Sequence, residues 1–146
     1  VVRLSQHPRI AGVKEATGDL SREESILKHA KPGFILLSGD DPTAAELMKR
    51  GARGVISVTA NVAPRAMHDM CAAALAGDHG LAASLNERLM PLHLGLFVES
   101  SPIPVKWAVA RLGLMQGGIR LPLTPLSERL EDDVLAAMKS AGVQSP

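Results

Sequence analysis

The chain has 146 residues, enough for one ordinary domain, and its 46% apolar and 21% charged residues are typical of a globular protein. The formal net charge of +1 argues against a nucleic-acid-binding arm or a polybasic membrane anchor, and two Phe, one Trp and no Tyr are too few for a base-stacking surface. The single cysteine, Cys71, excludes an internal disulfide and fits a reducing compartment.

No apolar run reaches the roughly 18 residues of a membrane span, because Pro, Gly and charged residues interrupt every run. The first residues also lack the basic and apolar regions of a secretory signal. We therefore expect a cytoplasmic protein with no membrane partner. Because the chain begins with Val1, we also expect it to be a piece of a longer protein.

The first half of the sequence alternates short apolar segments with helical patterns. Apolar or β-branched runs bounded by turn residues predict three strands, over residues 10–16, 34–38 and 54–59. The second run is continuous, which is typical of a strand buried on both faces. Starts about 20–24 residues apart suit parallel strands joined by crossover helices, so an α/β fold is predicted.

Helices are expected between and after these strands. The predicted ranges are 20–30, 42–51 and 63–77. Ser21 and Glu24 have the spacing of a capping box at the start of the first helix. Asp41 and Pro42 suit the N-cap and the first position of the second helix.

The second half of the sequence is helical, with predicted ranges 79–98, 102–113 and 125–141. We expect these three helices to pack on each other and on the α/β part, which divides the chain into residues 1–78 and 79–146. Three parallel strands leave unpaired edges. The chain therefore either pairs these edges with another chain or forms the last part of a larger sheet.

Lys14 is the first candidate for chemistry, because reactive groups in parallel α/β folds gather at the carboxyl ends of the strands. Strand alternation places Gly12, Lys14 and Ala16 on one face, and the small neighbours leave a hollow around the lysine. A dehydrated ammonium loses its proton more easily, and the free amine can attack a carbonyl carbon. Alternatively, Lys14 reaches solvent or pairs with Glu15.

Two further polar segments follow predicted strands. In the segment 38–41, Gly39 could let a backbone N–H approach an anionic ligand, or the segment could serve only as a turn and helix cap. In the segment 57–61, hydroxyl and amide groups could bind substrate or cap a helix. The five histidines have no spacing typical of a metal site, and no phosphate-binding glycine motif is present. We expect neither a metal nor a cofactor.

The sequence resembles the C-terminal half of dihydrodipicolinate synthases, also called 4-hydroxy-tetrahydrodipicolinate synthases, over essentially its whole length. The resemblance rests on six segments in the family's order: Gly12-Val-Lys-Glu-Ala-Thr-Gly-Asp19, Leu37-Ser-Gly-Asp-Asp41, Gly54-Val-Ile-Ser-Val-Thr-Ala-Asn-Val62, Arg88-Leu-Met-Pro-Leu-His93, Pro102-Ile-Pro-Val-Lys-Trp107 and Leu121-Pro-Leu-Thr124. Class I pyruvate aldolases such as N-acetylneuraminate lyase share the fold and the lysine strand.

This resemblance implies the last three strands of a (β/α)8 TIM barrel, followed by a C-terminal three-helix domain. Lys14 would form a Schiff base with pyruvate, and the resulting enamine would attack L-aspartate semialdehyde, a lyase reaction in lysine and diaminopimelate biosynthesis. Gly39 and Ile56 would line the pyruvate pocket mainly through backbone groups. The family is commonly a homotetramer, so a homo-oligomer is expected.

The chain also departs from the family, because such a barrel usually needs about 250 residues. The first five strands are absent, and with them the proton-relay hydroxyls and the arginine that meets the semialdehyde. We therefore expect the parent protein to be the enzyme and this chain alone to be inactive or nearly so. The alternatives are another pyruvate-dependent class I aldolase and a non-catalytic α/β fragment that acts by association.

Overall fold

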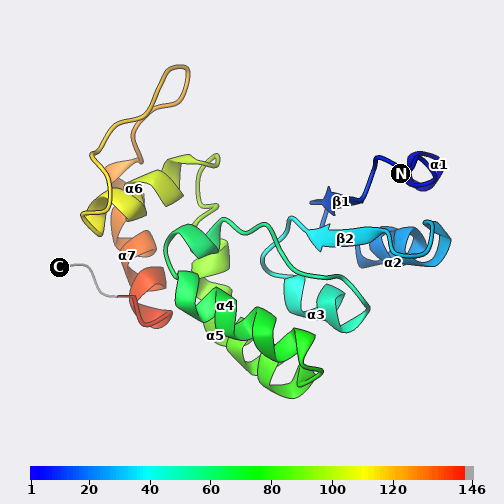
Figure 1. Cartoon of the computed structure of the whole chain (residues 1–146). Coiled ribbons are helices and arrows are strands. Elements are labelled where there is room, and N and C mark those ends of the chain that lie inside the picture. Colours follow the sequence, from blue (N-terminus) through cyan, green and yellow to red (C-terminus); the bar gives the residue numbers. More distant parts are fainter. Residues whose placement is uncertain (144–146) are drawn as a thin grey trace. The chain divides into compact units, whose positions relative to one another are not determined.

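The computed structural model describes residues 1–143 (Figure 1). In chain order its elements are α1 Val2–Ser5, β1 Gly12–Glu15, α2 Leu20–His29, β2 Ile35–Ser38, α3 Ala44–Lys49, the 3-10 helix η1 Thr59–Asn61, α4 Pro64–Leu75, α5 His79–Gly95, α6 Ile103–Arg111, the 3-10 helix η2 Glu128–Leu130 and α7 Glu131–Ser140. Two compact units are present. One holds Val1–Ser57 and Asp69–Ser84, and the other holds Val58–His68 and the chain from Leu85 onward.

The sheet of the first unit confirms the parallel arrangement but not the third strand. β1 and β2 pair in parallel, with Lys14 opposite Leu37. The predicted strand over 54–59 is reduced to one parallel bridge between Ser38 and Val55. Backbone hydrogen bonds join this segment and the residue before it to β2, from Arg53 N–H to Leu36, from Ser38 N–H to Gly54 and from Ile56 N–H to Ser38. The chain then turns into η1, so the pairing stays short.

The two faces of β2 differ, so the prediction of a strand buried on both faces is wrong. Leu36 and Ser38 are fully buried, whereas Ile35 is 42% exposed. α2 and α3 both contact β2 and account for the buried face. The opposite face, to which Ile35 belongs, is more open. Lys14 belongs to that open face, because it lies opposite Leu37 in the register.

One predicted helix cap and two predicted helix starts are also corrected. Asp19, not Ser21, is the N-cap of α2, and its Oδ1 accepts hydrogen bonds from the backbone N–H groups of Ser21 and Arg22. α3 begins at Ala44 rather than at Pro42, after a turn in which Thr43 bonds to Asp40. The last helix begins beyond Pro125, with η2 leading into α7 at Glu131.

The second unit is built around buried contacts between helices. His93 on α5 is fully buried, and its Nδ1 lies 2.8 Å from Thr59 Oγ1 on η1. α5 and α7 approach closely at Gly95, where an added Cβ would lie 2.6 Å from the Cβ of Ala137. α6 contacts α7, and Trp107 Nε1 donates a hydrogen bond to Glu131 at 3.2 Å. The expectation that the C-terminal helices pack on each other is therefore met for these pairs.

Candidate functional site

Lys14 lies near the carboxyl end of β1, where its side chain runs over the backbone of the neighbouring strand. A Cβ added at Gly39 would lie 2.5 Å from both Lys14 Cε and Ala16 Cβ, so the glycine leaves room for the lysine stem in its observed position. The expected dehydrated hollow is not found in this chain, because Lys14 is exposed. The small neighbours Gly12 and Ala16 provide space, but no described residue closes over that space.

The other two predicted site residues lie at the same edge of the sheet. Gly39 N–H donates to the Glu15 carbonyl at 2.6 Å, which ties the end of β2 to the end of β1. Ile56 N–H donates to the Ser38 carbonyl at 2.8 Å from the opposite side of β2. Lys14, Gly39 and Ile56 therefore come from three adjacent parallel segments. Because both N–H groups are engaged within the sheet, the backbone groups these two residues could offer a ligand are their carbonyl oxygens.

The hydrogen bonds after β2 form a turn that leads into α3. Ser38 Oγ donates to the Asp40 carbonyl at 2.9 Å and accepts from the Asp40 N–H at 3.1 Å. The Asp40 carboxylate accepts from Thr43 through both the backbone N–H and the hydroxyl. After the third segment, Thr59 bonds to His93 and Asn61 Nδ2 donates to the Val58 carbonyl at 3.0 Å. The bonds of the first segment are those expected of a turn, whereas the Thr59–His93 bond joins the second segment to α5.

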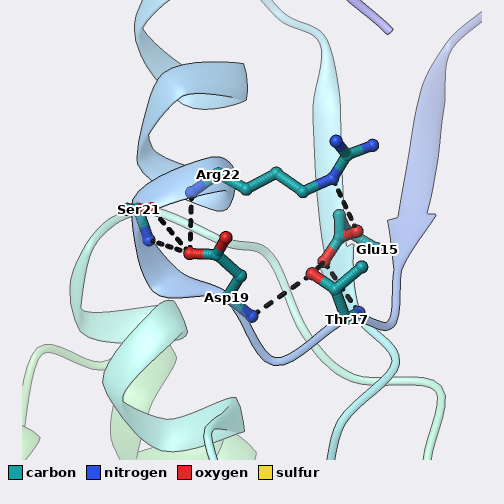
Figure 2. Close-up of polar contacts among 5 residues, drawn as sticks. All are labelled: Glu15, Thr17, Asp19, Ser21 and Arg22. Atoms are coloured by element: carbon teal, nitrogen blue, oxygen red, sulfur yellow. Dashed lines mark hydrogen bonds and ion pairs between the residues drawn. The ribbon is translucent and has the colours of Figure 1, made fainter.

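Figure 2 shows a network of polar contacts around Glu15. Glu15 follows Lys14 in β1, so strand alternation places the two side chains on opposite faces. Glu15 Oε2 accepts from the Thr17 N–H at 3.0 Å and from the Thr17 hydroxyl at 2.7 Å, and Arg22 Nε donates to Glu15 Oε1 at 3.0 Å. Burial alone would raise the pKa of Glu15, but these hydrogen bonds and the Arg22 charge hold it below its usual value. Glu15 is therefore an ionised anchor of the β1–α2 turn, not a partner of Lys14.

Sequence analysis missed the residue next to this anchor, Glu23 on α2. Its side chain is fully buried, and neither carboxyl oxygen has a hydrogen-bond donor among residues 1–143. Burial raises its pKa to about 7, and the negative charge and hydrogen bonding of Glu15 add to the effect. The signal available in the sequence was position: Glu23 lies three residues before Ile26, the other buried residue of α2.

Other kinds of site find no support in the part of the chain that the structure describes. Residues 1–143 contain no cluster of three or more His, Cys, Asp or Glu side chains able to hold a metal ion. A pocket beside Trp107 is lined by Ile103, Ala110, Ile119 and Leu126 among others, all of the second unit, and by none of the predicted site residues. No helix within the described range is long and apolar enough to cross a membrane.

The fold and the site define a parallel α/β protein with a lysine at the carboxyl edge of its sheet. Residues 1–141 match the protein family described as "Dihydrodipicolinate synthetase family". The chain belongs to this family.

Individual relatives agree with this assignment. The chain is 57% identical to a 4-hydroxy-tetrahydrodipicolinate synthase of Azoarcus sp. (strain BH72) over 99% of its length, and 58% identical to that of Stutzerimonas stutzeri (strain A1501) over 98%. Its structure superposes with a TM-score of 0.94 on a dihydrodipicolinate synthase from Acinetobacter baumannii complexed with pyruvate, at 50% identity over 98% of the chain. In each case the chain spans 49% of the relative.

Proposed function

We propose that this chain supplies the lysine-bearing half of a 4-hydroxy-tetrahydrodipicolinate synthase, a lyase that condenses pyruvate with L-aspartate semialdehyde in lysine biosynthesis. The observation that carries the proposal is the placement of Lys14 across Gly39 at the carboxyl edge, in a chain that belongs to this family. The proposal extends to the last three strands of a TIM barrel, a three-helix domain, a homotetramer and a cytoplasmic location. It also retains the domain boundary at residue 78.

In the proposed reaction, the Lys14 amine attacks the keto carbon of pyruvate and water leaves, which forms an imine. The protonated imine withdraws electrons from the adjacent methyl group, so that a methyl proton can leave and an enamine forms. The enamine carbon then bonds to the aldehyde carbon of L-aspartate semialdehyde. Attack of the semialdehyde amine on the imine carbon closes the ring and releases the lysine.

The residues of this chain have separate tasks in that scheme. Lys14 is the nucleophile. Gly39 keeps the space beside its stem clear, and the carbonyl groups of Gly39 and Ile56 face the bound keto acid. The exposure of Lys14 means that this chain alone does not supply walls that exclude water from the lysine. We therefore expect little activity from this chain without the missing half of the barrel.

The test is a chimaera in which residues 1–143 replace the corresponding half of the Acinetobacter baumannii enzyme, which is 50% identical to this chain. Incubation with pyruvate and borohydride should leave a reduced adduct on Lys14, located by peptide mass spectrometry. Lys14→Arg should abolish the adduct, whereas Lys49→Arg, at an exposed position on α3, should retain it. A folded chimaera that carries no adduct, or an adduct that survives Lys14→Arg, would overturn the proposal.

A further inference from the structure

The Glu15 carboxylate has one hydrogen-bond position left. Two carboxylate oxygens offer about four acceptor positions. Thr17 fills two of these positions with its N–H and its hydroxyl, and Arg22 Nε fills a third. The oxygen that receives Arg22 therefore accepts one bond where it could accept two. A donor beside Glu15 would complete the set.

Glu23 has the opposite requirement. As an ionised carboxylate it would be fully buried with no donor to either oxygen, a state that costs far more than burying a neutral acid. As a neutral acid it carries one O–H group, which needs an acceptor. Of the acidic groups around Glu23, Glu15 acts on it most strongly, and the Glu15 oxygen that receives Arg22 has an acceptor position open. A protonated Glu23 can donate to such a position, whereas two ionised carboxylates cannot form a hydrogen bond with each other.

The charges around Glu23 all favour the proton on this residue. Three acidic groups act on it from three elements: Glu15 on β1, Asp40 after β2 and Asp19 at the start of α2. Arg22, the nearby base, bonds to Glu15 instead, and this bond keeps Glu15 as the ionised partner. Two like charges in one buried site cannot both persist, so the more deeply buried group holds the proton.

We propose that Glu23 is a neutral acid that shares its proton with Glu15, and that this carboxyl pair is a positioning device for Lys14. Glu15 follows Lys14 directly in β1, and its carbonyl receives the Gly39 N–H. Fixing the Glu15 side chain therefore fixes the two backbones between which the lysine lies. The second part of this inference rests on the proposed function, whereas the shared proton does not.

The first test measures the proton directly, by NMR of the carboxyl carbons of the 146-residue chain across a pH range. Glu23 should titrate within about one pH unit of 7, and the Thr17 amide should shift with the same midpoint, because its N–H bonds to Glu15. Glu23→Gln should remove both transitions. Glu24→Gln, one residue along the same helix at an exposed position, should preserve them. Titration of Glu23 in the ordinary carboxyl range, or a Thr17 amide that does not respond, would overturn the inference.

The second test measures positioning in the chimaera, through the rate of pyruvate trapping as a function of pH. The parent rate should show the Glu23 ionisation in its pH dependence. Glu23→Gln can still donate to Glu15, so it should keep the rate and lose that ionisation, whereas Glu23→Ala should lower the rate about tenfold at every pH. Equal rates and pH profiles in all three proteins would refute positioning. Absence of trapping in all three would count against the proposed function and leave the shared proton to the NMR result.

Discussion

Substitution of Gly39 by alanine tests the close approach on which the candidate site depends. The added Cβ would lie 2.5 Å from both the Lys14 Cε and the Ala16 Cβ, and 3.1 Å from the Ala16 Cα. Carbon atoms in contact prefer about 3.5–4.0 Å, so each close pair must separate by about 1 Å. The lysine stem can rotate away, but Ala16 cannot move without its backbone. The β1 end must therefore shift, or the Gly39–Glu15 hydrogen bond must lengthen.

The expected cost follows from this overlap. Overpacking in a tightly packed region destabilises the folded state by about 1–3 kcal/mol. Alanine also lowers the conformational entropy of the unfolded chain, which offsets about 0.4–1 kcal/mol of that cost. We expect a net destabilisation of about 1–2 kcal/mol, measured by urea unfolding followed by far-ultraviolet circular dichroism with an unchanged m-value. In the chimaera, displacement of Lys14 should slow pyruvate trapping by about tenfold or more, because a rise of about 1.4 kcal/mol in the activation free energy lowers a rate tenfold.

Gly80→Ala is the matched control for this substitution. Gly80 lies in α5, and an added Cβ would meet only the Asp78 carboxylate, at 3.7 Å. Alanine should stabilise this helix by about 0.5–1 kcal/mol and leave trapping unchanged. The reasoning fails if Gly39→Ala behaves like Gly80→Ala in both assays.

Two further predictions concern buried polar groups. The pKa of Glu23 is about 7 in the folded state and about 4.5 in the unfolded state. The stabilisation that this group contributes is therefore complete below pH 4.5, falls as the pH rises and is lost above about pH 7. The difference in unfolding free energy between the parent and Glu23→Gln should therefore change by up to about 3 kcal/mol across that window in urea titrations, and a constant difference would contradict the raised pKa. Thr59→Val keeps the shape of the side chain but removes the hydroxyl that bonds to the buried His93, so the free energy of unfolding should fall by about 1–3 kcal/mol. An unchanged midpoint of urea unfolding would show that this bond contributes nothing to stability.

The local pattern of the sequence predicted much of the fold because alternation and apolar runs are local properties. The parallel pairing of β1 with β2 was expected from the spacing of the runs, and α2, α4, α5 and α6 lie within about three residues of their predicted ends. The cap of α2 and the start of α3 were placed wrongly because several polar residues in each turn could act as the cap. Tertiary contacts decided between them, as where Asp40 binds Thr43 and the helix begins after this turn.

The candidate site shows the same division. The placement of Lys14 on the same face as Gly12 and Ala16 followed from strand alternation. The depth of the lysine environment was not a local property, because it depends on which segments cover the face. The exposure of Lys14 could therefore be learned only from the structure.

The residue types and their order determined the parallel α/β arrangement, the lysine at a strand end and the glycine beside it. These features need only the periodicity of the backbone and the size of single side chains. The tertiary structure alone decided that Glu23 is buried with no hydrogen-bond donor to its oxygens and that acidic groups act on it. The energy of a buried charge depends on the groups that surround it in space, and residues from three separate elements provide that surrounding here.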